Sequence, residues 1–296
     1  NDASPDNTVD ILYDYAFLDY FNSVTRSENQ GMNINIKLML TEVSCKSEYQ
    51  LIITDDDYLQ PQVLDGIVKF LRSRQNELLE VSAIWTPRYS YTENGDLHCV
   101  VCSPFKHNAL LKPSAFNAGR YMINGFVLSG LFVCAKRIDF EFWETYSDNA
   151  YFPMIFFGDL IINNGAYYWH CNIVHHTVLN QCHWESWGRT DLLIEIKKFS
   201  DSVNTYKIIT KKISGRLELL KFYFASLPSI LLEVRSFLGS DNIKVDKEIM
   251  REAIKEQKAN GTFKLTSPIK ELVLFSFFAN VVIFAMKLSA LQLILS

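Results

Sequence analysis

Hydrophobic positions near the start of the chain follow two different spacings. Residues 9–21 and 34–43 carry apolar side chains at helical intervals, and Asn7 and Thr8 can cap the first of these helices. Residues 49–54 form instead a short, uninterrupted apolar run, which is typical of a strand buried on both faces. The pattern therefore predicts two helices followed by a buried strand.

The following segments continue this alternation of strand and helix. Three consecutive aspartates, residues 55–57, close the strand, and Pro61 stands where a first helical turn accepts proline. The expected buried face of that helix consists of Val63, Leu64, Ile67, Val68 and Leu71. Residues 81–91 and 129–133 predict two further strands. Helices and strands in this order indicate an α/β fold.

The character of the chain changes near residue 214. Residues 216–238 predict a helix rich in Leu and Phe, with a kink at Pro228, and residues 272–295 are almost wholly apolar. We expect one α/β domain over residues 1–213 and a helical extension over residues 214–296. The apolar stretch approaches the length of a membrane span of roughly 20 residues, so a buried helix, an interfacial helix and a true span all remain open.

Charge and cysteine content narrow the class of protein. The formal net charge is -4 and no block of Lys or Arg stands out, which argues against nucleic acid as a partner. Six cysteines are scattered through the chain, which favours reduced thiols in the cytoplasm over a disulfide framework. Cys99 and Cys102 have zinc-knuckle spacing, but no second pair follows, and the valines between them favour a strand interior.

The acidic triplet Asp55, Asp56 and Asp57 is the main candidate for chemistry. Three adjacent carboxylates repel one another, so a turn that contains them favours a bound cation. Carboxylate oxygens suit a hard ion such as Mg²⁺ or Mn²⁺, which binds one or two protein acids together with substrate phosphates. The triplet alone is equally compatible with a turn that places acids at the amino end of the following helix.

Two further segments shift this balance. Asn1 to Asp6, Asn29 to Gly31 and Ile52 to Pro61 resemble, in order and spacing, the inverting family-two glycosyltransferases, and among them bacterial O-antigen enzymes such as abequosyltransferases. That family shows an Asp-Asp-Gly-Ser-x-Asp-like turn, an Asn-x-Gly turn and a DxD-type motif followed by proline. The resemblance covers residues 1–140 and implies a GT-A-like, Rossmann-type mixed sheet flanked by helices.

The resemblance also implies roles for single residues. Asp2 matches the aspartate that recognises the base, and Ser4 belongs to the same nucleotide-binding turn. Asp55 matches the position near the ribose, Asp56 the ligand of the metal that bridges to the diphosphate, and Asp57 a support through water. The implied cofactor is Mg²⁺ or Mn²⁺, and the implied donor is a nucleotide sugar.

The catalytic base is less clearly marked. An inverting transfer needs a carboxylate to accept the proton of the attacking hydroxyl, and the Glu-Asp pair that usually supplies it in the family is missing. Asp148 is the first candidate and Asp159 the second, although each is also typical of a solvated acid or a helix cap. His175 and His176 lie near the donor in one interpretation, but an ordinary strand pair is the favoured one.

The family's first strand and its Pro-x-x-Asn-type turn have no counterpart before Asn1, so we expect the sequence to be truncated at its N-terminus. Within the family, the implied activity is that of a hexosyl- or deoxyhexosyltransferase that acts on a glycan or lipid-linked acceptor in surface polysaccharide synthesis. We expect a cytoplasmic location at the inner face of the membrane, with residues 272–295 as an interfacial helix.

Two alternatives remain beside this prediction. One is a non-catalytic protein of the same fold that binds nucleotide sugars or carbohydrates. The other is a nucleotidyltransferase, which also uses paired acids with Mg²⁺ but normally needs a Gly-rich phosphate loop that this chain lacks.

Overall fold

The computed structural model describes residues 1–43, 47–55, 57–91, 97–101, 103–177, 201–202 and 204–239. Its α-helices are α1 (Thr8–Asp14), α2 (Met32–Val43), α3 (Val63–Ser73), α4 (Gln75–Leu78), α5 (Ala115–Tyr121), α6 (Phe140–Tyr146), α7 (Phe152–Asn164) and α10 (Arg216–Gly239). Short 3-10 helices are η1 (Met122–Phe126) and η2 (Ala135–Arg137). The strands are β1 (Gln50–Ile52), β2 (Asp57–Leu59), β3 (Ala83–Trp85), β4 (Arg88–Tyr91), β5 (Leu97–Val101), β6 (Ala109–Leu111), β7 (Leu131–Val133), β8 (Ala166–Tyr168) and β9 (Val174–Thr177).

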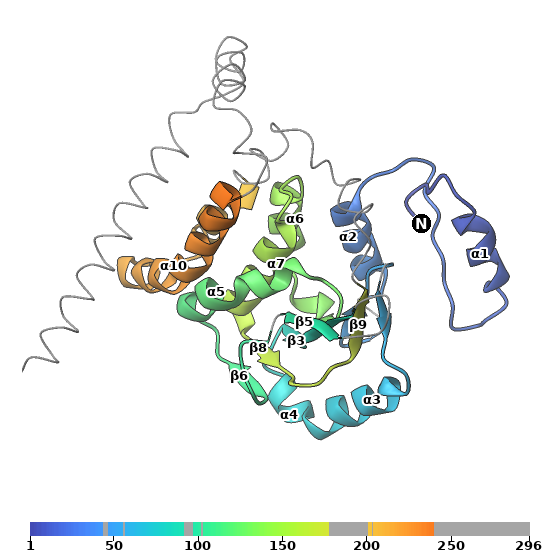
Figure 1. Ribbon diagram of the computed structural model, residues 1–296, viewed down its shortest axis with the longest axis horizontal. Coiled ribbons are helices and arrows are strands. Elements are labelled where there is room, and N and C mark those ends of the chain that lie inside the picture. The colour runs from blue at the N-terminus through green and yellow to red at the C-terminus, as the bar shows by residue number, and fades with distance from the viewer. Residues whose placement is uncertain are drawn as a thin grey trace, which may run out of the picture.

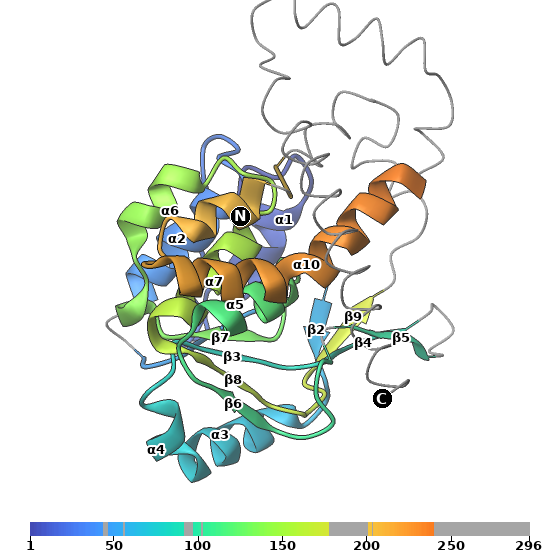
Figure 2. The ribbon, with the colours of Figure 1, turned by 90° about the vertical axis from the view of Figure 1, so that its left-hand side faces the viewer.

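The strands form two sheets. The larger has the order β1-β7-β3-β8-β6, in which β3 and β8 are parallel and the other neighbours are antiparallel. The smaller has the order β2-β9-β4-β5, with β4 and β9 parallel. Because β3 leads into β4, the smaller sheet continues from the end of the larger one (Figure 2). The predicted α/β fold, a mixed sheet flanked by helices, is confirmed.

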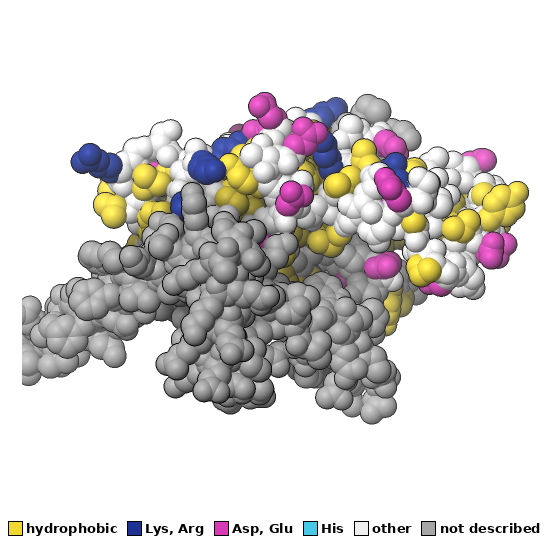
Figure 3. All heavy atoms as spheres, turned by 90° about the horizontal axis from the view of Figure 1, so that it is seen from above, with side chains coloured by type: hydrophobic (Ala, Val, Ile, Leu, Met, Phe, Trp, Pro, Cys, Tyr) yellow, Lys and Arg dark blue, Asp and Glu magenta, His cyan; other side chains and the backbone are white. Residues whose placement is uncertain are grey.

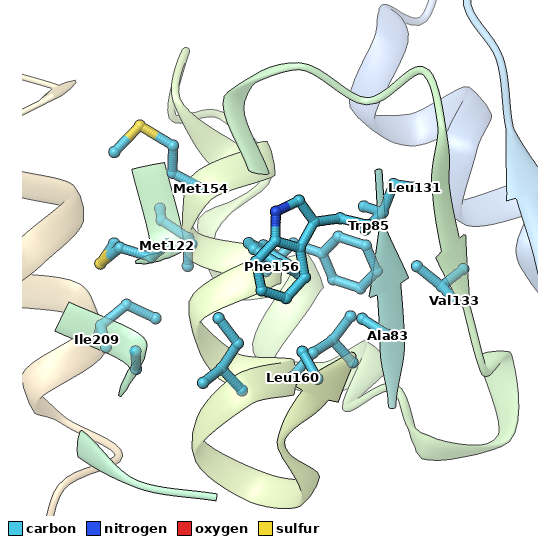
Figure 4. Close-up of a cluster of buried hydrophobic side chains, with 14 of the residues drawn as sticks. Ala83, Trp85, Met122, Leu131, Val133, Met154, Phe156, Leu160 and Ile209 are labelled. Carbon is cyan, nitrogen blue, oxygen red and sulfur yellow. The ribbon is translucent and has the colours of Figure 1, made fainter. Parts of the chain in front are cut away.

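Helices cover both faces of the larger sheet. Helices α2, α5, α6, α7 and α10 lie on one face, and α3 and α4 on the other (Figure 2). The central helix α7 is buried along almost its whole length, and Trp85 of β3 packs edge-on against its Phe157 at 5.4 Å between ring centroids. Figure 4 shows Trp85 pointing from the sheet toward Phe156 and Leu160 of this helix. This side of the sheet carries the main hydrophobic core.

Most strand and helix predictions near the acidic triplet are confirmed. The apolar run 49–54 contains β1, and the helix after Pro61 is α3. Its predicted buried face is partly wrong, because Leu64 and Val68 are exposed, whereas Phe70 is buried with Ile67. Phe70 turns inward because its ring stacks on that of Trp169, with 4.0 Å between the ring centroids.

The single strand predicted over residues 81–91 is two strands in two sheets. β3 ends at Trp85 and β4 begins at Arg88, and Thr86 and Pro87 lie between them. Pro87 has no backbone N–H, so the ladder cannot run through it without losing a hydrogen bond. The break matters for function, since it moves Arg88 from the central sheet into the smaller one.

The N-terminal segment lies apart from the cores. Helix α1 covers only the first part of the helix predicted over residues 9–21, and it contains no buried residue. It projects from the body of the molecule (Figure 1), and its side chains and those that follow form a mixed hydrophobic and acidic surface (right-hand end of Figure 3). Tyr13, Phe17 and Tyr20 are each about four-fifths exposed. Asp6, not the predicted cap, accepts from the backbone and the hydroxyl of Thr8.

The first helix of the predicted C-terminal extension packs into the main core. Helix α10 lies along α5 (Figure 1), and Phe222 is fully buried. Gly119 permits this contact, because a Cβ there would lie 2.5 Å from the carbonyl oxygen of Phe222. Residues 272–295 lie outside the described residues. Within the part of the chain that the structure describes, no helix is long and apolar enough to cross a membrane.

Candidate active site

The acidic turn lies where β1 ends and β2 begins. Asp55 is exposed and Asp57, the first residue of β2, is half-buried. The hydroxyl of Thr54 donates to Oδ2 of Asp57 at 3.1 Å, and the backbone N–H of Asp57 donates to the carbonyl of Thr54 at 3.2 Å. Asp56 lies outside the described residues. Thr54 therefore holds Asp57 through two hydrogen bonds.

A buried serine supports this turn from behind. Ser129 is fully buried, and its Oγ accepts from the backbone N–H of Thr54 at 2.9 Å and lies 2.7 Å from Thr54 Oγ1. The carbonyl of Ile52 accepts from the N–H of Gly130 at 3.0 Å. Every contact here satisfies a buried polar group that would otherwise be costly. The acids thus stand on a rigid, hydrogen-bonded base.

Gly130 is the second component of that base. Its φ is +84°, in the left-handed region that favours glycine. A Cβ at this position would lie 2.7 Å from Oγ1 of Thr86, whose hydroxyl donates to the carbonyl of Gly130 at 3.3 Å. The Ser129-Gly130 turn therefore approaches Thr86, between β3 and β4, more closely than a residue with a Cβ allows.

Arg88 was missed by sequence reasoning and belongs to this site. It is fully buried at the start of β4, and its Nε donates to the carbonyl of Ser129. A fully buried arginine is rare unless anions or polar groups surround it. The sequence feature that could have indicated Arg88 was a positively charged residue inside a predicted strand, between the aromatic residues Trp85 and Tyr89. Through Ser129 and Thr54, the guanidinium group connects to the acidic turn.

The structure brings two of the resemblance's motifs into direct contact. Oδ1 of Asp2 accepts from the backbone N–H of Gln30, and Oδ2 from that of Gly31, both at 2.8 Å. The hydrogen bond from Gln30 is the main cause that lowers the pKa of Asp2 below its usual 3.8. Ser4 donates its backbone N–H to Asn1 Oδ1 at 3.1 Å. This paired turn leads directly into α2.

Helix α2 connects the turn that holds Asp2 to the segment that carries Asp148. Asn33, in the first turn of α2, donates to the carbonyl of Ser147, the neighbour of Asp148. Asp148 is exposed just beyond the end of α6, and Lys37 of α2 forms an ion pair with Glu144 of α6. A connection of only six residues, 44–49, joins α2 to β1. Asn33 and Lys37 of α2 therefore connect the paired turn to the segment that carries Asp148.

Asp159 lies in a different environment. It is buried on α7, where Nδ2 of Asn163 donates to its Oδ1 at 2.9 Å and Lys212 Nζ lies 3.3 Å away. Lys212 also pairs with Asp139, the N-cap of α6, at 2.6 Å. Burial raises the pKa of Asp159, and the charge of Lys212 opposes this shift. Helix α6 is about 10 Å long. Asp139 caps its N-terminal end, and Asp148 follows its C-terminal end.

The histidine pair lies on the strand next to the acidic turn. β9 pairs with β2 so that the backbone of His176 is opposite Asp57, and His175 is opposite Tyr58. The favoured prediction of an ordinary strand pair agrees with this placement, and the register also puts the pair beside Asp57. Cys102, the second cysteine of the zinc-knuckle spacing, lies outside the described residues.

Carboxylate chemistry at the turn suits a hard cation. Asp55 and Asp57 offer oxygen ligands where β1 ends and β2 begins, and the buried guanidinium of Arg88 connects to this turn through Ser129 and Thr54. Among the described residues, which exclude Asp56, no three His, Cys, Asp or Glu side chains gather as a metal site. The described cavity lined by Ser47, Tyr49 and Gln75 lies at the opposite end of β1.

A family model matches the N-terminal part of the chain. Residues 1–97 match the family model Glycosyl transferase family 2. The match covers about a third of the chain and includes the Asp2 turn, the Asn29 to Gly31 turn and the acidic triplet. No curated protein matches the chain.

The match to Glycosyl transferase family 2 supports a family-two glycosyltransferase of the GT-A fold, and with it sugar transfer in general. It implies a nucleotide-sugar donor and an acceptor as partners. Strand β4, which carries Arg88, lies within the matched range, whereas Ser129 and Asp148 lie beyond it.

Proposed function

We propose that this protein transfers a hexosyl or deoxyhexosyl unit from a nucleotide sugar to a glycan or lipid-linked acceptor in surface polysaccharide synthesis, at the inner face of the membrane. The observation that carries the proposal is the acidic turn after β1, held by Thr54 and Ser129 and backed by buried Arg88. A turn of this kind costs free energy in the free protein and gains from a cation and a diphosphate.

On the donor side, each acid has a separate role. Asp2 accepts a hydrogen bond from the base, and its two backbone contacts to Gln30 and Gly31 hold the carboxylate in one orientation. Ser4 belongs to the same turn, and Asp55 faces the ribose. A carboxylate has about four acceptor sites, so the two backbone contacts leave capacity for a ligand.

Asp56 and Asp57 hold Mg²⁺ or Mn²⁺ in this proposal. When bound, the ion offsets negative charge on the diphosphate. Arg88 adds a fixed positive charge behind the turn, where burial strengthens its field. The hydroxyl of Thr54, in contact with Asp57, keeps that carboxylate turned toward the site.

On the acceptor side, Asp148 serves as the base. It accepts the proton of the acceptor hydroxyl as the oxygen attacks the anomeric carbon, and the bond to the diphosphate breaks with its electron pair on the leaving oxygen. Asp148 is exposed and follows a helix that α2 orients, which suits a group that meets an incoming substrate. Asp159 is engaged with Lys212 and Asn163, and we assign it to packing.

Donor hydrolysis by the chain of 296 residues tests the proposal. A panel of nucleotide sugars is incubated with Mg²⁺ or Mn²⁺, and release of the nucleotide is measured before and after chelation. We expect turnover that chelation abolishes and that Asp56→Ala lowers by about a hundredfold or more, because a group that stabilises the leaving charge is lost.

Asp65→Ala is the matched control, because Asp65 is an exposed acid on the neighbouring helix α3. Its rate should stay within about twofold of wild type, the range of a surface change. Full metal-dependent turnover by Asp56→Ala would show that the metal assignment is wrong. Tight nucleotide-sugar binding without any hydrolysis or transfer would favour the non-catalytic alternative.

A further inference from the structure

The two faces of the smaller sheet differ in chemistry. Arg88, Ser90 and Val174 point to the buried face. The opposite face, which we name the tyrosine face, consists of Tyr58, Tyr89, Tyr91, Leu97, Val100 and His175. Exposed fractions on it reach 50% for Tyr58, 55% for Leu97 and 43% for Val100. At these positions the tyrosine face has no Lys, Arg, Asp or Glu.

Three rings on this face form a continuous stack. Tyr58 stacks on His175 with 4.4 Å between centroids and 19° between planes, and Tyr91 stacks on the same imidazole at 4.0 Å and 26°. Nδ2 of Asn172 lies 3.4 Å from the hydroxyl of Tyr91. The stack comes from three strands, β2, β9 and β4, so the sheet fixes the rings before any ligand arrives. Pre-ordered rings lose little entropy on binding.

The position of Tyr58 connects the stack to the acidic turn. Asp57 and Tyr58 are consecutive residues of β2, so their Cα atoms are about 3.8 Å apart and their side chains point to opposite faces. β2 is an edge strand of the sheet. A molecule that lies on Tyr58 can therefore extend around the edge of β2, an edge strand among the described residues, toward the acids.

The chemistry of the tyrosine face suits an uncharged sugar. The C–H face of a pyranose is apolar and packs on an aromatic ring, whereas its hydroxyls need polar partners at the rim. Exposed Tyr58 offers a ring face, and the phenolic groups of Tyr58, Tyr89 and Tyr91 offer donors and acceptors around it. A hydrocarbon chain would satisfy the rings but leave these hydroxyls without partners.

We propose that the tyrosine face binds the acceptor as an uncharged pyranose oligosaccharide, with one sugar ring stacked on Tyr58. Its identity as the acceptor site rests on the proposed function. The site holds sugar units behind the one that reacts, so it sets affinity for the acceptor chain. Tyr58 is the residue whose ring makes the main contact, and His175 and Tyr91 position that ring.

Saccharide binding, measured without any donor, tests the proposal. Cellotetraose, maltotetraose and mannotetraose are titrated against the full chain, and binding is followed by saturation-transfer NMR. We expect at least one of the three to bind, Tyr58→Ala to weaken it by about tenfold, and Tyr58→Phe to retain most of the affinity because the ring face remains. Tyr20→Ala, at a tyrosine 83% exposed on the N-terminal segment, is the matched control and should bind like wild type.

The outcomes separate this proposal from the proposed function. Tyr58-dependent binding by a protein that hydrolyses no nucleotide sugar would retain the saccharide site and contradict the transferase. Metal-dependent donor hydrolysis with saccharide affinity unchanged in Tyr58→Ala would retain the transferase and overturn the saccharide site. Binding of none of the three saccharides, or Tyr58-dependent binding to phosphatidylcholine–phosphatidylglycerol vesicles alone, would also overturn it.

Discussion

Two regions of this protein concentrate carboxylates, and they use them in opposite ways. At the end of β1, Asp55 is exposed and Asp57 is half-buried, and the turn that carries them rests on hydroxyl and backbone contacts. Between α6 and α7, Asp139 and Asp159 share the ammonium group of Lys212, and Asp159 is buried. The first region leaves charge for a ligand, whereas the second neutralises it within the fold.

The comparison shows that an acid's partners, more than its presence, indicate its role. A carboxylate held by neutral donors keeps its negative charge available to a cation or an incoming proton. One that pairs with a lysine in a dry contact has its charge already compensated. This difference separates Asp148 from Asp159, which looked alike as base candidates in the sequence.

The largest expected effect separates those two acids directly. Asp148→Asn should lower kcat for transfer by about a hundredfold, or roughly 2.7 kcal/mol of barrier, because the base is lost while the side chain keeps its shape. Asp159→Asn should retain kcat when assayed well below its unfolding temperature. Steady-state kinetics with saturating donor check both, and equal losses in the two variants would contradict the assignment.

Removing Lys212 should expose the cost of the buried acid. Lys212→Met leaves Asp159 without its cation, and we expect the free energy of unfolding to fall by about 2 kcal/mol, less than for a fully buried pair because Lys212 is 23% exposed. Chemical denaturation measures the loss. Lys211→Met is the control, because Lys211 is exposed and its Nζ donates to the hydroxyl of Tyr146.

The same variant has a defined pH dependence. Burial raises the pKa of Asp159 above 3.8, so the folded state holds its proton more tightly than the unfolded chain, and stability falls as the pH rises through that window. Loss of Lys212 should raise the pKa further. The deficit of Lys212→Met relative to wild type should therefore be largest at neutral pH and shrink toward pH 4, and a deficit independent of pH would contradict the pairing.

A smaller effect should follow from the support of the acidic turn. Ser129→Ala removes the acceptor of the Thr54 N–H, and we expect about 1.5 kcal/mol of lost stability together with weaker binding of Mn²⁺. Ser82→Ala is a matched control, because Ser82 is equally buried and its hydroxyl has no hydrogen bond within the described residues. Similar losses in both variants would show that the serine network does not support the turn.

The smallest effect concerns the turn that holds Asp2. Ala3 has a φ of 58°, which strains an alanine, and glycine stands there in the turn it resembles. Ala3→Gly should raise the free energy of unfolding by about 0.5 kcal/mol, after the entropy gained by the unfolded chain is subtracted. Ala16→Gly, at a residue without positive φ, should lower it. Thermal denaturation of both variants distinguishes a strained turn from a general effect of glycine.

Local pattern was a good guide to elements and a poor guide to their partners. The apolar run before the acids and the helix after Pro61 were predicted, since both depend on neighbours along the chain. The division of residues 81–91 between two sheets was not, because strand pairing depends on β7, β8 and β9 far away in the sequence. The exposure of Leu64 and Val68 on α3 was also missed, because it depends on which distant residues pack against the helix.

The sequence by itself determined the α/β class, the acidic turn at the end of a strand and the motifs that resemble a glycosyltransferase. These are properties of short segments, and backbone geometry and side-chain chemistry act within a few residues. Only the tertiary structure paired Asp2 with Gly31, buried Arg88 behind Ser129, and engaged Asp159 with Lys212. Those contacts join residues tens of positions apart, so burial and charge pairing in the folded state decided them.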